Sequence, residues 1–199
     1  MLALHHVPLS RSLRVRWLLE ELGLRYELVT HSFADLKQPD HLALHPLGKV
    51  PVLRDGDAVL YESGAILQHL LERYGEGRLE PKPGTRERSL FWQWFHFAEA
   101  TLAPPLGLIV RHSVLLPEPE RVPAVLGFAR GQAEGALAPV ERALAGRSWL
   151  LPEFSAADIM LGYSVKLSSF VRLLGDTTPN LRAYLARCEE RPAWQRAIA

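Results

Sequence analysis

The chain has 199 residues, of which 48% are hydrophobic and 23% are charged, a composition that is typical of a folded globular protein and excludes a disordered or fibrous one. Its 23 Lys and Arg against 22 Asp and Glu give a formal net charge of +1, which supplies no field to draw the protein to nucleic acid or to an anionic membrane. The lone cysteine, Cys188, excludes an internal disulfide, and no run approaches about 18 apolar residues, so we expect a cytoplasmic protein without a membrane span.

The first thirty residues predict a strand, a helix and a second strand. Residues 1–5 form a short strand-like run, and residues 13–22 place apolar side chains on one helix face. Gly23 supplies the left-handed residue that ends such a helix. Residues 26–30 predict a second strand, and a unit of this order favours parallel pairing of its two strands.

The next stretch predicts a helix, a hairpin and a further helix. We expect a helix over residues 39–45. Apolar runs at 50–54 and 57–61 flank an Asp-Gly pair, which is typical of a tight antiparallel hairpin. A helix over 62–74 follows, closed by Gly75. The order βαβαββα is that of a thioredoxin-like α/β domain.

The composition then changes in a way that indicates a domain boundary. Residues 75–84 are rich in Gly, Pro and charge, as a connector between packed units is. Beyond them apolar residues recur only at helical spacing. We therefore expect a thioredoxin-like domain over 1–77, a linker over 78–85 and an all-α helical-bundle domain over 86–199.

Four sequence signals place helix boundaries in the second half. Ser155 and Asp158 form a variant of the capping box at a helix start. Thr178-Pro179 starts another helix with proline in its first turn. Pro104-Pro105 is expected to break or kink the first long helix, and Pro139 to strain the next one.

Ser10 is the first candidate for chemistry. It follows the first strand and precedes the first helix, where outward-pointing amides and the helix dipole favour an anion such as a thiolate. Serine is also strongly preferred as an N-cap. Position alone therefore leaves Ser10 and Ser12 open as simple caps.

Two dipeptides could hold a peptide-like ligand. A cis bond at Val50-Pro51 would turn the Val50 backbone outward, where it could pair with the main chain of a bound peptide; an ordinary trans edge proline is the alternative. Glu62-Ser63 comes where a strand ends and a helix begins, so the first amides could grip a carboxylate while Glu62 takes an ammonium group. Ser63 as a plain cap is the alternative there.

The combination of these segments resembles a known family. The chain contains, in order, HHVPLSRSLRVRWLLEELGLRYE, HPLGKVPVL, YESGAILQHLLERY, FSAADIM and RPAWQRAI. Their succession over almost the whole length is similar to that of bacterial cytosolic glutathione transferases of the serine type. The resemblance implies a thioredoxin-like domain followed by an all-helical domain, in a homodimer.

The resemblance also implies site roles. Ser10 would donate a hydrogen bond to the glutathione sulfur, with Ser12 as the alternative. Val50 would pair with the cysteinyl unit through its backbone, next to a cis proline, and Lys49 would face a glutathione carboxylate. Glu62 and its neighbour would hold the γ-glutamyl end. The implied glutathione-binding residues are Ser10, Lys49, Val50, Pro51, Glu62 and Ser63.

The activity that the resemblance implies is conjugation of the glutathione thiolate to a small hydrophobic electrophile, as in detoxification. Glutathione would be a co-substrate, and no tightly bound cofactor is expected. Three other glutathione-dependent reactions suit the same scaffold: isomerisation, dehalogenation and disulfide reduction. A non-catalytic binding or regulatory protein of the same fold is a further alternative.

The electrophile is expected in a cleft between the domains, walled by the first long helix of the second half. Residues 91, 94, 95 and 98 form a stripe at helical spacing, which favours a core role for them. The residues proposed to line the pocket are Trp92, His96, Glu99 and Arg111.

We expect no metal site and no reactive cysteine. His5 and His6 are adjacent in a strand, so they point to opposite faces, and no acidic partner lies at ligand spacing. Cys188 falls in a late helix among charged neighbours, and a spectator thiol is the favoured interpretation.

Overall fold

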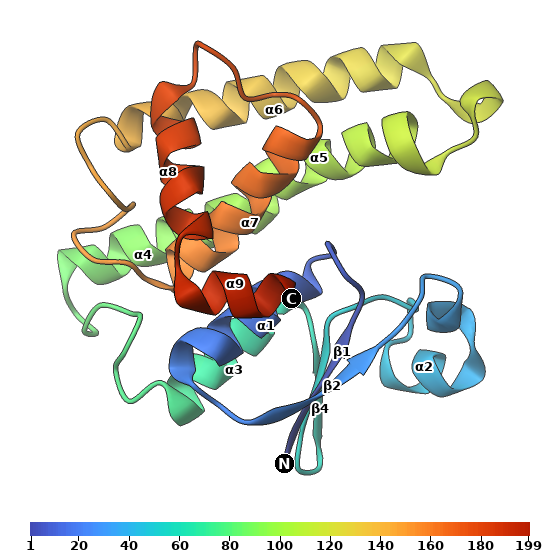
Figure 1. The fold of residues 1–199 in the computed structure, drawn as a ribbon, viewed down its shortest axis with the longest axis vertical. Helices are drawn as coiled ribbons and strands as arrows, with labels where there is room; N and C mark the ends of the chain where they lie inside the picture. Colours follow the sequence, from blue (N-terminus) through green and yellow to red (C-terminus); the bar gives the residue numbers. More distant parts are fainter. The chain divides into compact units, whose positions relative to one another are not determined.

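A computed structural model describes residues 1–199, which divide into two compact units (Figure 1). Residues 1–80 and 190–199 form the first unit, and residues 81–189 form the second. The first boundary lies inside the linker expected over 78–85. The second boundary was not expected from the sequence.

The C-terminal end of the chain therefore differs from the expectation of one helical domain over 86–199, because its last ten residues group with the first unit. The last helix, α9 (Pro192–Ile198), packs along α1 (Ser12–Leu22) in the first unit. Trp194 meets Trp17 edge to face, with ring centroids 4.7 Å apart, and both side chains are buried. Two buried indoles contribute a large apolar area, so this contact explains why the last ten residues group with the N-terminal unit.

The first unit contains the predicted order of strands and helices around one four-stranded sheet. The strand order is β2-β1-β3-β4. β1 pairs parallel with β2 and antiparallel with β3, and β3 pairs antiparallel with β4. The thioredoxin-like prediction is confirmed. The strands are β1 (Leu2–His6), β2 (Tyr26–Thr30), β3 (Val52–Asp55) and β4 (Ala58–Tyr61).

Helices cover both faces of this sheet (Figure 1). α1 and α3 (Ser63–Tyr74) lie on one face, where Leu4 and Leu53 are completely buried. The short helix α2 (Pro39–Leu44) lies on the other, preceded by the 3-10 turn η1 (Asp35–Lys37). Because neighbouring residues of a strand face opposite sides, each face of β1 meets a different helix.

The two helix-ending glycines behave differently. Gly23 has φ 68° and ends α1 in the predicted left-handed conformation. Gly75 has φ −74° and ends α3 in a right-handed one. A side chain at Gly75 would collide with the carbonyl oxygen of Leu71, so this glycine is required by close packing and not by its backbone angle.

All regular elements of the second unit are helical, as predicted. Its longest helix is continuous over 21 residues, with Pro139 inside it. The elements are α4 (Arg86–His96), η2 (Phe97–Leu102), α5 (Ala103–Val110), η3 (Arg111–Leu115), η4 (Glu118–Glu120), α6 (Pro123–Ala143), α7 (Ala156–Phe170) and α8 (Pro179–Glu189).

The helix break expected at Pro104-Pro105 is present as a change from α-helical to π-helical geometry. The π-helical segment η2 separates α4 from α5, and both prolines fall in the first turn of α5. A proline in that turn removes no intrahelical hydrogen bond. The wider π turn therefore takes up the irregularity that the prolines impose.

α7 is the core helix of the second unit, and its predicted capping box is confirmed. Ser155 and Asp158 exchange side-chain and backbone hydrogen bonds at its start. The Asp158 carboxylate also accepts the amide of Leu150 at 3.0 Å and the hydroxyl of Tyr184 at 3.1 Å. Burial raises the pKa of Asp158 to about 6, although these hydrogen bonds oppose the shift.

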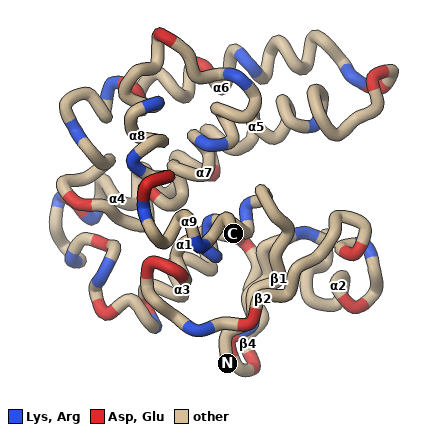
Figure 2. The backbone as a smooth tube through the Cα atoms, in the orientation of Figure 1, with Lys and Arg blue, Asp and Glu red and all other residues tan.

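Charged residues are distributed over both units. Figure 2 shows Lys and Arg interspersed with Asp and Glu along the chain, which agrees with the formal charge of +1. None of the helices combines the length and the apolar character that a membrane span requires.

Candidate functional site

The strand register brings three loops to one edge of the sheet. His5, near the end of β1, pairs with Val52 at the start of β3. Val52 in turn pairs with Tyr61 at the end of β4. The loops that follow β1, precede β3 and follow β4 therefore start from the same edge. They carry the predicted residues Ser10, Lys49, Val50, Pro51, Glu62 and Ser63.

Two helices begin at this edge. α1 starts at Ser12, directly after the β1 loop, and α3 starts at Ser63, directly after β4. The first amides of a helix have no partner within the helix, and its dipole is positive at that end. The edge therefore offers two places where an anion can be held.

Ser10 and Ser12 share a hydrogen bond but differ in exposure. Their hydroxyl oxygens lie 2.7 Å apart. Ser12 is completely buried; its oxygen accepts the amide of Val7 at 3.3 Å and lies 2.8 Å from Nδ1 of His6. Ser10 is half-buried and accepts the amide of Ser12 at 3.3 Å. Ser12 is thus an internal link, and Ser10 is the end of the chain of hydroxyls.

His6 enters this network as a neutral ring. Burial, with a smaller contribution from Arg16, lowers the pKa of His6 to about 4. A neutral imidazole carries one N–H and one acceptor nitrogen. The network from His6 through Ser12 to Ser10 therefore involves no charged group at neutral pH.

The Val50-Pro51 bond is cis, as the resemblance implied. Val50 is half-buried, Pro51 is buried and Lys49 is exposed. The Lys49 carbonyl oxygen accepts the Nε2 proton of His41 at 2.8 Å. A buried ring from α2 thus holds the loop that carries the proposed main-chain contact.

Glu62 and Ser63 form the turn from β4 into α3. Glu62 is exposed and has φ 73°, an unusual conformation for a residue with a side chain and one that clusters at functional sites. Ser63 is buried, and its hydroxyl accepts Nη1 of the fully buried Arg14 at 3.1 Å. The start of α3 has no side-chain cap, so the alternative of Ser63 as a plain cap is not what the structure contains.

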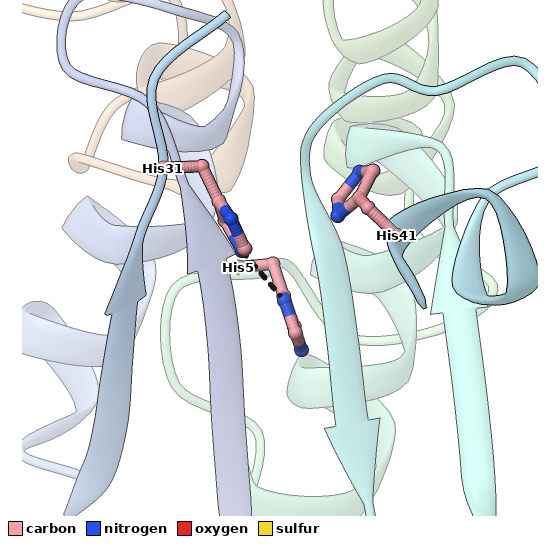
Figure 3. Close-up of side chains that lie close together, drawn as sticks. All are labelled: His5, His31 and His41. Carbon is pink, nitrogen blue, oxygen red and sulfur yellow. Dashed lines mark hydrogen bonds between the residues drawn. The ribbon is translucent and has the colours of Figure 1, made fainter. Parts of the chain in front are cut away.

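The structure also assembles a group of histidines that sequence reasoning missed. His5 points away from His6, as expected, and its Nδ1 lies 2.9 Å from Nε2 of His31. The His41 ring lies 5.0 Å from that of His31 (Figure 3). Burial, together with His31, His41 and Arg54, lowers the pKa of His5 to about 4. His31 lies two residues beyond Val29, the β2 partner of His5, and this spacing was the available signal.

The residues proposed for the electrophile lie on successive segments of the second unit. Trp92 and His96 both lie on α4, and their rings stack against each other with centroids 5.7 Å apart. Glu99 is half-buried on η2, and Arg111 is exposed on η3. Phe91, Phe95 and Ala98 are buried and Trp94 is half-buried, so the stripe is largely core, as expected.

Cys188 is completely buried on α8. Its neighbours in sequence are charged, yet none of its side chain reaches solvent. A buried thiol of this kind reacts slowly with solutes.

Comparisons with known proteins indicate one family. A family profile described as the glutathione S-transferase N-terminal domain matches residues 4–81. Glutathione S-transferase GstB of Escherichia coli is 32% identical over 185 residues, covering 90% of this chain and 88% of that protein. Glutathione S-transferase 3 of Schizosaccharomyces pombe is 39% identical over 105 residues, covering 52% of this chain and 43% of the relative.

A solved structure extends the similarity to the whole chain. The glutathione transferase from Pseudomonas putida, which holds one glutathione disulfide per subunit, has a TM-score of 0.90 at 28% identity and covers 99% of this chain and 90% of that one. The chain spans about half the length of the first curated relatives that it matches, and most of GstB. The chain therefore belongs to the glutathione S-transferase family.

Proposed function

We propose that the chain transfers the thiolate of reduced glutathione to a small hydrophobic electrophile. The observation that carries this proposal is the position of Ser10, whose half-buried hydroxyl ends an internal hydrogen-bonded chain at the start of α1. The loops with Val50 and Glu62 start from the same edge of the sheet. The relative from Pseudomonas putida holds glutathione disulfide, which supports a glutathione-derived ligand for this chain.

Ser10 would act by stabilising the thiolate. A free thiol has a pKa of about 8.5, so only a few per cent is ionised at neutral pH. A hydrogen bond to a charged group contributes about 1.5 to 3 kcal/mol, or roughly one to two pKa units. The start of α1 adds a few tenths to about 1 kcal/mol. Together these contributions make the thiolate the major form without a general base.

The remaining groups would hold the tripeptide. Val50 offers its main chain to the cysteinyl unit in the manner of an added strand. The start of α3 and the Ser63 hydroxyl would bind the γ-glutamyl carboxylate, while Glu62 takes the ammonium group. Because Arg14 donates to the Ser63 oxygen, the Ser63 proton is available to a bound carboxylate. Lys49 would face a second carboxylate.

Replacement of the serine tests the proposal. We expect Ser10→Ala to lower kcat/KM for conjugation of an aryl halide by about 10- to 100-fold, the loss of one hydrogen bond to a charge. Retention on immobilised glutathione should stay close to that of the wild type. Ser169→Ala, at an exposed serine of the second unit, is the matched control. Unchanged turnover in Ser10→Ala would assign thiol activation to another group.

Glutathione-dependent disulfide reduction is a second candidate, favoured by the glutathione disulfide in the Pseudomonas putida relative. With a serine at position 10, the thiolate of bound glutathione would attack a mixed disulfide directly, releasing the other thiol and forming glutathione disulfide. Parallel assays with an aryl halide and with a mixed disulfide of glutathione distinguish the two reactions. A larger kcat/KM for the disulfide would favour reduction over conjugation.

Four further expectations belong to this proposal. The pocket residues Trp92, His96, Glu99 and Arg111 are proposed to contact the electrophile. The homodimer follows from the family resemblance, as does the role in detoxification. The cytoplasmic location stays a prediction from the sequence.

A further inference from the structure

We propose that His5, His31 and His41 form a binding site for one divalent transition-metal ion of the zinc type. One ring nitrogen from each residue lies within 4.8 Å of those of the other two. The three residues come from β1, from the loop directly after β2 and from α2, and Figure 3 shows their rings gathered on one side of the sheet. This proposal does not depend on the proposed transferase activity.

The hydrogen bond made by His41 leaves one of its ring nitrogens available to an ion. Its Nε2 proton is donated to the Lys49 carbonyl oxygen at 2.8 Å, which leaves Nδ1 as the nitrogen with a lone pair. That Nδ1 is buried and has no hydrogen-bond partner. Metal-binding histidines commonly donate their second ring nitrogen to a carbonyl or carboxylate, and a buried polar atom without a partner calls for an explanation.

His5 and His31 supply the other two nitrogens. Nδ1 of His5 lies 2.9 Å from Nε2 of His31, so one ring donates and the other accepts. Binding of an ion replaces this hydrogen bond by two metal–nitrogen bonds. The donor ring then carries its proton on its other nitrogen, so each ring stays neutral and no proton is lost. His31 is half-exposed and gives the ion a path from solvent.

The ligand set selects the class of ion. Three imidazoles suit Zn²⁺, Co²⁺, Ni²⁺ or Cu²⁺ and do not suit Mg²⁺ or Ca²⁺, which prefer oxygen. In a tetrahedral zinc site two ligand nitrogens lie roughly 3.3 Å apart, so small ring rotations must open the 2.9 Å pair of His5 and His31 slightly and bring the His41 ring nearer to it. Two charged side chains lie near the cluster, Arg54 near His5 and Asp35 near His31. Their charges have opposite signs and both side chains are exposed, so water screens their effect on an ion.

A bound ion would act as a structural brace. It would join the ends of β1 and β2 to α2 and, through His41, to the loop of Lys49. Because the unfolded chain has no preformed site, the ion stabilises the folded chain, and Tm should rise with the logarithm of the ion concentration once that concentration exceeds Kd.

Metal titration of the full chain, prepared without a histidine tag and stripped with a chelator, tests the site. Calorimetry with Zn²⁺ should show one ion per chain, and Co²⁺ should give the visible absorption of a tetrahedral site. His31→Ala and His41→Ala should each weaken binding by at least tenfold. His96→Ala, at an exposed histidine of the second unit, should leave the affinity unchanged.

A second measurement uses the unmodified protein and so does not depend on the folding of any variant. Anomalous diffraction from crystals soaked in Zn²⁺ should place the ion within bonding distance of His5, His31 and His41. An ion elsewhere, no binding of Zn²⁺ or Co²⁺, or an affinity that both histidine variants leave unchanged would overturn the proposal. Glutathione binding measured on the same samples reports separately on the transferase proposal.

Discussion

At the scale of single residues, two serines separated by one position have different surroundings. Ser12 is completely buried and bonded on several sides, whereas Ser10 is half-buried and bonded to Ser12. The sequence placed both hydroxyls near the start of a helix but could not separate them. The loop after β1 that leads to them contains Leu9, which has φ 61°. A positive φ at leucine is uncommon, and no pattern in the sequence predicts it here.

Ser12→Ala should reduce thiol activation less than Ser10→Ala does. Ser12 does not reach the sulfur in our proposal but supports Ser10 through their 2.7 Å hydrogen bond, so kcat/KM should fall by a few-fold. The thiol pKa of bound glutathione, followed by thiolate absorbance, should rise by less in Ser12→Ala than in Ser10→Ala. The reverse order would make Ser12 the group that meets the sulfur.

Ser12→Ala should also lower the stability of the folded protein. Removal of the Ser12 hydroxyl leaves the buried Val7 amide and His6 Nδ1 without this partner. We expect a loss of about 1 to 3 kcal/mol in the free energy of unfolding, measured by urea denaturation. Ser10→Ala should lose less, because its hydroxyl is closer to solvent. Equal losses would contradict the distinction between an internal link and an accessible end.

At the scale of elements, local signals succeeded where the determining partners are close in sequence. The Asp-Gly hairpin, the left-handed Gly23 and the Ser155 capping box depend on a few neighbouring residues, and all three are present. The grouping of α9 with α1 depends on Trp17 meeting Trp194. Periodicity marks a buried face but not the surface that covers it, so this partner could not be predicted.

Loss of the second indole tests that grouping. Trp194→Ala should cost about 3 to 5 kcal/mol of stability, as truncation of a large buried aromatic does, and should destabilise the first unit. Ile198→Ala changes a residue of the same helix that is 48% exposed and should cost less than about 1 kcal/mol. Thermal and urea unfolding of both variants measure the difference. A mild effect of Trp194→Ala would mean that α9 contributes little to the first unit.

The capping carboxylate of α7 gives a pH dependence with a defined sign. Burial raises the pKa of Asp158 from 3.8 to about 6 in the folded state. Between these values the folded chain binds more protons than the unfolded chain, so the contribution of Asp158 to stability falls as pH rises through this window. Asp158→Asn removes this titration.

Urea unfolding at several pH values between 4 and 7 measures the effect. Asp158→Asn should be less stable than the wild type throughout, because the amide group cannot accept all the hydrogen bonds made to the carboxylate. The gap between them should narrow as pH rises, by up to roughly 3 kcal/mol for two pKa units. A gap that widens with pH would show that the hydrogen bonds outweigh burial.

At the scale of the whole molecule, a change in the sequence pattern predicts an α/β part followed by a helical part. Strand-like alternation and a hairpin precede residues 75–84, and only helical spacing follows them. The candidate glutathione site stays a prediction, which rests on a family resemblance that short motifs next to strand ends carry. The histidine cluster was not predictable, because His31 and His41 lie in stretches with no motif and meet His5 only through the sheet register.

The assembly state is a prediction at this scale. We expect a homodimer, so light scattering coupled to gel filtration should give twice the chain mass of 22.3 kDa. The ratio should hold over a wide range of protein concentration if the dimer is stable. A single species of the monomer mass would contradict the prediction.

The burial of Cys188 has a consequence for how the protein would tolerate oxidants. Disulfides and peroxides in solution modify exposed cysteines, through mixed disulfides or sulfenic acid. Here the sole sulfhydryl is sealed inside the helical unit. The folded chain should therefore gain no mass when incubated with oxidised glutathione or dilute hydrogen peroxide, apart from oxidation of its two methionines.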